Sequence, residues 1–112
     1  MDLTCDQLTN FLFAKADSKR IPLAGSFELT PRCTLDCKMC YIHKRSSDKS
    51  VICQEKSTEF WLDLAEKARD AGMLILLLTG GEPLLRSDFN EIYTECKKLG
   101  LLISVNTNAT LL

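Results

Sequence analysis

The chain has 112 residues, of which 46% are hydrophobic and 26% are charged, and its net charge is -1. This size and composition predict one small domain with a packed core and exclude a largely disordered chain. Because acidic and basic residues are mixed, the charge balance argues against nucleic acid as a partner. The short basic group Lys44, Arg45 and Lys49 is interrupted by other residues, which is typical of a solvated loop.

The six cysteines would suit a small secreted disulfide scaffold. The N-terminal residues, however, include neither the basic segment nor the long apolar stretch of a signal peptide. The longest apolar run, residues 73–78, is too short to cross a bilayer. We therefore expect a cytoplasmic protein with no membrane partner, in which clustered cysteines bind a metal more often than they pair as disulfides.

The first part of the chain is predicted to form a helix and a strand. The helix covers residues 4–16 and begins at Thr4, a good N-cap residue. Residues 21–25 form a connector, and residues 26–30 form a short strand. A cysteine-rich loop follows this strand at once.

Two further helices and two further strands are expected after the cysteine-rich loop, beyond a polar segment, residues 41–55, that is predicted to be irregular. They are, in chain order, a helix from Ser57 or Thr58 up to Gly72, a strand over 73–78, a helix from Ser87 or Asp88 up to Gly100, and a strand over 101–105. The continuous apolar run of the second strand predicts burial on both faces. Phe60 and Trp61 are expected in the core.

The alternation of strand, helix, strand, helix and strand predicts an α/β fold with a parallel sheet. We divide the chain into an N-terminal helix and connector, residues 1–25, and a core, residues 26–112. Residues 31–40, 79–83 and 106–108 each follow a strand, so we expect them at the carboxyl-end edge of the sheet. In parallel α/β folds, ligands bind at that edge.

The first of these loops contains three cysteines within a span of eight residues: Cys33, Cys37 and Cys40. A closed structural zinc site or an ordinary iron–sulfur site uses four protein ligands. Three thiolates would therefore leave one coordination position of a metal centre open for a substrate. His43 could instead complete a structural zinc knuckle, so both alternatives remain open on spacing alone.

The second loop contains Gly80, Gly81, Glu82 and Pro83. The glycines lack a β-carbon, so a ligand can approach their backbone closely. The carboxylate of Glu82 could pair with an ammonium group, and Pro83 stiffens the exit from the loop. Taken alone the segment would be a tight turn, but opposite the cysteines it could hold an amino acid whose amine and carboxylate reach the open metal position.

Three segments together resemble the radical S-adenosylmethionine enzymes: residues 30–41 (Thr-Pro-Arg-Cys-Thr-Leu-Asp-Cys-Lys-Met-Cys-Tyr), 80–83 (Gly-Gly-Glu-Pro) and 106–112 (Asn-Thr-Asn-Ala-Thr-Leu-Leu). The sequence is most similar to the branch that includes peptide-modifying maturases, sulfatase-maturing enzymes and the molybdenum-cofactor cyclase. The similarity runs from about Phe27 to the last residue. It implies a partial (β/α)6 TIM-like barrel, of which this chain would supply a βαβαβ half.

The resemblance also implies two cofactors. Cys33, Cys37 and Cys40 would ligate a [4Fe–4S] cluster, and S-adenosylmethionine would bind its fourth iron through its amine and carboxylate. The other expected contacts of S-adenosylmethionine come from three loops: Met39 near the adenine, Gly80, Gly81 and Glu82 at the methionyl end, and Asn106 or Thr107 at the end of the last strand.

In this family, reductive cleavage of S-adenosylmethionine yields a 5′-deoxyadenosyl radical that abstracts a hydrogen atom from the substrate, here a peptide or a small metabolite. The resemblance implies an electron donor of the flavodoxin or ferredoxin type.

Three strands are half of the expected barrel, so we expect a fragment: the N-terminal piece of a longer protein, a truncated reading frame, or a chain whose sheet a partner completes. The alternative functions are a cluster-binding module without catalysis and a zinc-knuckle interaction domain. Among the other cysteines, Cys96 lies on an apolar helix stripe and is expected in the core. Cys5 and Cys53 show no partner pattern.

Overall fold

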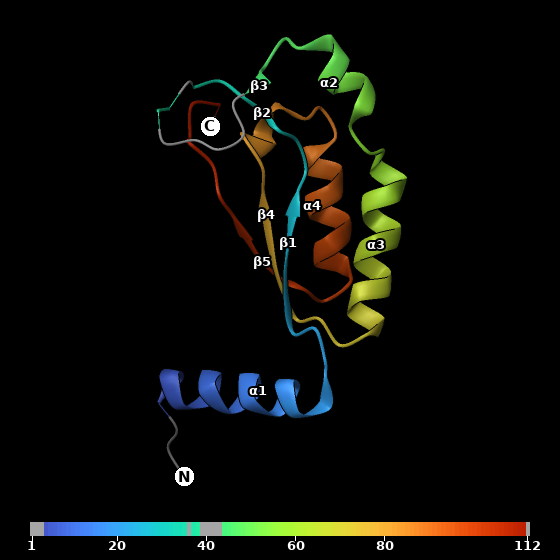
Figure 1. Cartoon of the computed structure of the whole chain (residues 1–112). Helices are drawn as coiled ribbons and strands as arrows, with labels where there is room; N and C mark the ends of the chain where they lie inside the picture. The colour runs from blue at the N-terminus through green and yellow to red at the C-terminus, as the bar shows by residue number, and fades with distance from the viewer. Residues whose placement is uncertain (1–3, 36, 39–43, 112) are drawn as a thin grey trace.

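A three-stranded parallel sheet with two helices on one face forms the centre of the computed structural model, which describes residues 4–35, 37–38 and 44–111 (Figure 1). The strands are β1 (Ala24–Glu28), β4 (Ile75–Thr79) and β5 (Leu102–Val105), in the order β1-β4-β5. The two helices are α3 (Thr58–Asp70) and α4 (Phe89–Lys98). This arrangement confirms the predicted α/β class and the parallel sheet. The total of six βα units in a complete barrel stays a prediction.

The register of the strands determines which side chains face the helices. Phe27 of β1 lies opposite Leu78 of β4, and Leu78 lies opposite Val105 of β5. Leu76 and Leu78 are fully buried, and they form the core with Phe27 and the inner faces of the two helices. The core therefore lies between the sheet and the helix layer.

The other face of the sheet is less covered than the sequence predicts. Side chains alternate along a strand, so Ile75 and Leu77 point away from the helices, and both are only half-buried. On β5, Leu102 is 57% exposed. The prediction that residues 73–78 are buried on both faces is therefore wrong in this structure, and the strand itself is shifted to Ile75–Thr79.

The two covering helices begin and end close to the predicted positions. The Ser57 hydroxyl caps α3 by accepting a hydrogen bond from the Phe60 N–H. Trp61 packs against Phe27 with ring centroids 5.1 Å apart, as expected for a core residue, whereas Phe60 is 42% exposed and is not in the core. Cys96 on α4 is fully buried, which confirms its prediction, and this burial raises the pKa of its thiol.

The N-terminal helix α1 (Cys5–Lys19) lies apart from the sheet in Figure 1. Thr4 caps it as predicted, through a reciprocal pair of hydrogen bonds with Gln7. Ala16 is its buried residue, while Leu8 and Phe11 on its apolar stripe are exposed. No helix within the described ranges is long and apolar enough to span a membrane.

The segment predicted to be irregular contains regular structure. It holds the short strand β3 (Lys44–Arg45), which pairs with β2 (Arg32–Cys33), and the helix α2 (Lys49–Gln54). The carboxylate of Asp48 caps α2 by accepting from the N–H groups of Ser50 and Val51. The prediction of a loop at the basic group was therefore wrong, although Lys49 is exposed as expected, and the helix was missed because the Asp48 cap was not taken into account.

Candidate functional site

The loops that follow the three strands meet at the carboxyl-end edge of the sheet, as the sequence predicts. The N–H of Gly81 donates to the Thr30 carbonyl at 2.7 Å, and the N–H of Glu82 donates to the Arg32 carbonyl, also at 2.7 Å. The glycine loop is thus paired by its backbone with the segment that leads into Cys33. Figure 1 shows both segments at the same end of the sheet, beyond β1 and β4.

The two glycines are required by this close backbone approach. A β-carbon on Gly81 would lie 2.2 Å from the carbonyl oxygen of Arg32. On Gly80, whose φ is +147°, it would lie 2.3 Å from the carbonyl oxygen of Thr30. From the sequence, these glycines are expected to allow the close approach of a ligand. The structure adds that they let the backbone of the cysteine loop come close.

Glu82 connects the glycine loop to the end of β5. Its side chain is fully buried. One carboxylate oxygen accepts from the Thr107 hydroxyl at 2.5 Å, and the other accepts from the N–H of Asn108 at 2.8 Å. The carboxylate that the sequence assigned to an ammonium group is therefore already hydrogen-bonded to protein donors, and it fixes the turn after β5.

Asn108 reaches from this turn to the first cysteine. Its side-chain N–H group lies 3.4 Å from the sulfur of Cys33 and 3.0 Å from the hydroxyl oxygen of Thr34. Its side-chain oxygen accepts from the N–H of Thr110 at 3.0 Å. Asn106 and Thr107 are the residues of this segment that the sequence predicts at the site; Asn108 was not predicted there. Nothing in the spacing could have found it, because Cys33 is 75 positions away.

A buried ion pair anchors the start of the cysteine loop. The guanidinium of Arg32 donates to Glu55 at 2.7 Å, and both side chains are about nine-tenths buried. Arg32 also donates to the Ser46 carbonyl at 2.9 Å, and the Thr30 hydroxyl donates to Glu55. Burial acts to raise the pKa of Glu55, but the hydrogen bonds from Arg32 and Thr30 outweigh it and hold that pKa below its usual 4.5.

A second buried arginine, Arg86, lies just after the 3-10 turn η1 (Pro83–Leu85). It donates to the Leu29 carbonyl at 2.9 Å and to the Lys56 carbonyl at 2.8 Å. It also forms a two-pronged pair with Asp88, with both distances 2.8 Å. The hydrogen bonds from Arg86 lower the pKa of Asp88 from 3.8 to about 2, although burial acts in the opposite direction.

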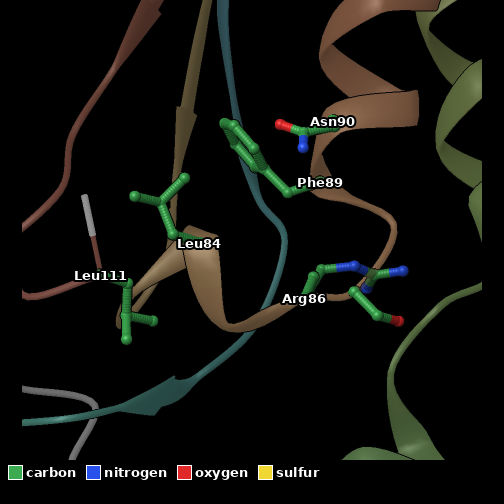
Figure 2. Close-up of a pocket in the computed structure, with 6 residues that line it drawn as sticks. Leu84, Arg86, Phe89, Asn90 and Leu111 are labelled. Carbon is green, nitrogen blue, oxygen red and sulfur yellow. The ribbon is translucent and has the colours of Figure 1, made fainter.

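A hollow of about 250 Å3 borders Arg86 (Figure 2). Figure 2 shows the apolar side chains of Leu84, Phe89 and Leu111 around it, from η1, α4 and the segment after β5. Arg86 is the one charged residue among the six described residues that line it, and its guanidinium is already paired with Asp88 and two carbonyls. These described residues therefore offer no unpaired charge to a ligand.

A larger cleft of about 420 Å3 opens between the ends of β4 and β5. It is lined by residues of these two strand ends: Thr79, Gly80, Gly81, Val105, Asn106, Thr107 and Asn108. Four of the predicted contact residues for S-adenosylmethionine thus line one cleft: Gly80, Gly81, Asn106 and Thr107. The buried Glu82 accepts a hydrogen bond from one of them, Thr107. Asn106 is exposed, and its N–H continues the ladder to the Leu78 carbonyl at 3.0 Å.

Two of the three predicted metal ligands lie within the described residues. Cys33 is half-buried, Cys37 is exposed, and both are free thiols. Cys40 lies outside the described residues, as do Met39 and His43. In the described part of the chain, no three His, Cys, Asp or Glu side chains come together as a metal site. The structure therefore brings Cys33 to the edge beside the cleft and leaves the complete ligand set as a prediction.

Comparison with known families gives a match to the Radical SAM superfamily over residues 27–112. The chain belongs to this superfamily. Its relatives include proteins named PqqA peptide cyclase from Xanthomonas euvesicatoria pv. vesicatoria and Xanthomonas axonopodis pv. citri, each 34% identical over 87 residues. These alignments cover 78% of the chain but only 23% of each relative. The similarity fits the peptide-modifying branch that the sequence resembles.

Proposed function

We propose that this chain provides the part of a peptide-modifying radical enzyme that binds a [4Fe–4S] cluster and S-adenosylmethionine. The observation that carries the proposal is the backbone pairing of Gly81 and Glu82 with Thr30 and Arg32, which sets the glycine loop beside the cysteine loop. The family membership and the name of the relatives, PqqA peptide cyclase, support a peptide as the substrate. The chain spans 23% of those relatives, so the activity of the whole protein is part of the proposal.

The chemistry of the donor set fits the cluster. Thiolates are the usual protein ligands of [4Fe–4S] clusters, and Cys33, Cys37 and Cys40 would supply three of them. A side-chain N–H of Asn108 lies against the Cys33 sulfur and supports this assignment, since hydrogen bonds to sulfur are a common feature around such clusters. When bound, the cluster and S-adenosylmethionine together supply a 5′-deoxyadenosyl radical, with one electron from a flavodoxin- or ferredoxin-type donor.

The protein residues position the cofactor and enclose it. Gly80, Gly81, Asn106 and Thr107 would contact S-adenosylmethionine along the cleft, and Met39 would contact its adenine. Glu82 contributes by holding Thr107 and the backbone of Asn108 in place, because its carboxylate accepts hydrogen bonds from both. We further propose that the sheet is half of a partial (β/α)6 barrel, which additional sequence or a partner chain would complete over the less covered face.

Anaerobic reconstitution with iron and sulfide tests this proposal. We expect about four irons per chain, a brown protein, and 5′-deoxyadenosine when S-adenosylmethionine and dithionite are added. Cys33→Ala should prevent cluster uptake, because it removes one of three thiolate ligands. The matched control is Cys53→Ala, which removes an exposed cysteine on α2 and should leave the iron content unchanged.

Two other results would contradict the proposal in different ways. A colourless protein that retains zinc would instead support the zinc-knuckle alternative with His43. A protein that takes up the cluster but yields no 5′-deoxyadenosine, even when joined to downstream sequence of the PqqA peptide cyclase relatives, would support a binding module without catalysis.

A further inference from the structure

The orientation of the Asn108 side chain is determined by its own hydrogen bonds. Its oxygen lies 3.0 Å from the backbone nitrogen of Thr110, and a backbone N–H can only donate. The oxygen must therefore face Thr110, and the amide nitrogen must face the sulfur of Cys33 and the hydroxyl of Thr34. The alternative amide orientation would place two donors against each other.

The turn that carries Asn108 is held on both sides. The backbone N–H of Asn108 donates to the carboxylate of the buried Glu82 at 2.8 Å. The next residue, Ala109, has a φ of +63°, which turns the chain sharply after Asn108. The Thr110 hydroxyl approaches the Thr34 hydroxyl at 2.7 Å, so the turn after β5 and the cysteine loop touch at a second point.

The amide of Asn108 has enough donors for both of its partners. A carboxamide nitrogen carries two N–H bonds, so one can serve Thr34 at 3.0 Å and the other Cys33 at 3.4 Å. An N–H bond directed at a ligand sulfur stabilises the more negative, reduced form of an iron–sulfur cluster. This effect would raise the reduction potential of a cluster that Cys33 ligates.

We infer that Asn108 is a positioning residue that donates a hydrogen bond to the Cys33 sulfur and thereby raises the reduction potential of the cluster. This inference rests on the proposed function, because it requires that Cys33 bind a cluster. It assigns a role to a residue outside the expected ligand set and outside the expected contacts of S-adenosylmethionine. The reaction it affects is the one-electron reduction of the cluster by the external donor.

The test is a redox titration of the reconstituted protein, followed by electron paramagnetic resonance. Asn108→Ala should lower the equilibrium constant of one-electron reduction by about tenfold, which corresponds to about 59 mV. Asn108→Asp should lower it further, because a carboxylate has no N–H and adds a negative charge. Asp can still accept from the Thr110 N–H, so this variant preserves the turn if the alanine variant loses it.

The matched control is Thr110→Val. It removes the hydroxyl that contacts Thr34 and that also donates to the Asn108 oxygen at 2.8 Å, but it retains the backbone N–H that orients Asn108. Its midpoint potential should therefore shift by much less than that of Asn108→Ala. Equal midpoints for the wild type and both Asn108 variants, with full iron content, would overturn the inference and leave the proposed function intact. An equal shift in Thr110→Val would also overturn it. A wild-type chain that takes up no cluster would contradict the proposed function itself, and the inference with it.

Discussion

The two ends of the sheet are stabilised by different kinds of contact. At the carboxyl end, buried polar groups connect the loops: Arg32 with Glu55, Arg86 with Asp88, and Glu82 with the turn after β5. At the amino end, backbone hydrogen bonds and apolar side chains join the segments: the Leu74 N–H donates to the Leu23 carbonyl at 2.8 Å, and Met73 lies against Gly25. Each buried polar group needs a partner in one geometry, whereas apolar side chains can repack. The end that carries the candidate site is therefore the more precisely specified one.

Two matched glycine substitutions give the largest expected difference between the ends. In Gly81→Ala the new β-carbon would lie 2.2 Å from a backbone oxygen of Arg32, so the loops must separate. In Gly25→Ala it would lie 2.9 Å from the Met73 sulfur, and a flexible methionine can move aside. Neither glycine has a positive φ, so backbone strain does not confuse the comparison.

We expect Gly81→Ala to lose about 3 kcal/mol of unfolding free energy, as for an overpacked site. Gly25→Ala should change it by less than about 1 kcal/mol, because alanine also restricts the unfolded chain. Urea unfolding followed by circular dichroism measures both values. Equal losses in the two variants would show that the carboxyl end adapts as readily as the amino end, contrary to the comparison.

The Arg86–Asp88 pair predicts a pH dependence of the carboxyl end. The pKa of the Asp88 carboxyl is about 2 in the folded chain, against an ordinary value of 3.8, so folding favours the ionised carboxylate. The resulting stabilisation, about 2 kcal/mol, is nearly complete above about pH 5 and is lost as the pH falls through 2. Asp88→Asn should therefore unfold more easily than the wild type at pH 7, and most of this difference should be lost as the pH falls towards 2.

The control for this pH dependence is Asp63→Asn. Asp63 pairs with Lys67 at 2.8 Å on the solvent face of α3, where water screens the interaction. Urea midpoints at pH 7, 4 and 2.5 should show no comparable convergence for this variant. A constant difference between Asp88→Asn and the wild type across this range would mean that the Arg86 pair contributes no ionisation-linked stability.

How much the sequence could predict also differs between elements and contacts. Helices α3 and α4 were predictable, because their apolar stripes extend over several turns and end at Gly72 and Gly100. The three strands were predictable as short apolar runs, although β1 and β4 lie up to two residues from their predicted bounds. The meeting of the three loops followed from their positions after parallel strands. The helix α2 was missed because six residues carry too little periodicity, and its signal was the single cap residue Asp48.

Individual contacts of the site could not be predicted from the sequence. Glu55 meets Arg32 across 23 positions, and Asn108 meets Cys33 across 75. Such pairs have no periodicity, and their geometry depends on the turns that carry them. The carboxylate of Glu82 shows the same limit, because the motif indicated a carboxylate that could pair with an ammonium group, not a buried one with Thr107 and Asn108 as its partners.

The smallest effect is expected at Phe11 on α1, below the amino end of the sheet. Its side chain is 58% exposed, and its nearby partner is the ammonium of Lys15, 5.9 Å from the ring centroid. We expect Phe11→Ser to lower the unfolding free energy by no more than about 0.5 kcal/mol. The same substitution at Phe27, which is 6% exposed in the core, should lower it by about 3 kcal/mol or more. If Phe11→Ser instead proved as costly as Phe27→Ser, the apolar stripe of α1 would have to be covered in solution, and the amino end would be as tightly specified as the carboxyl end.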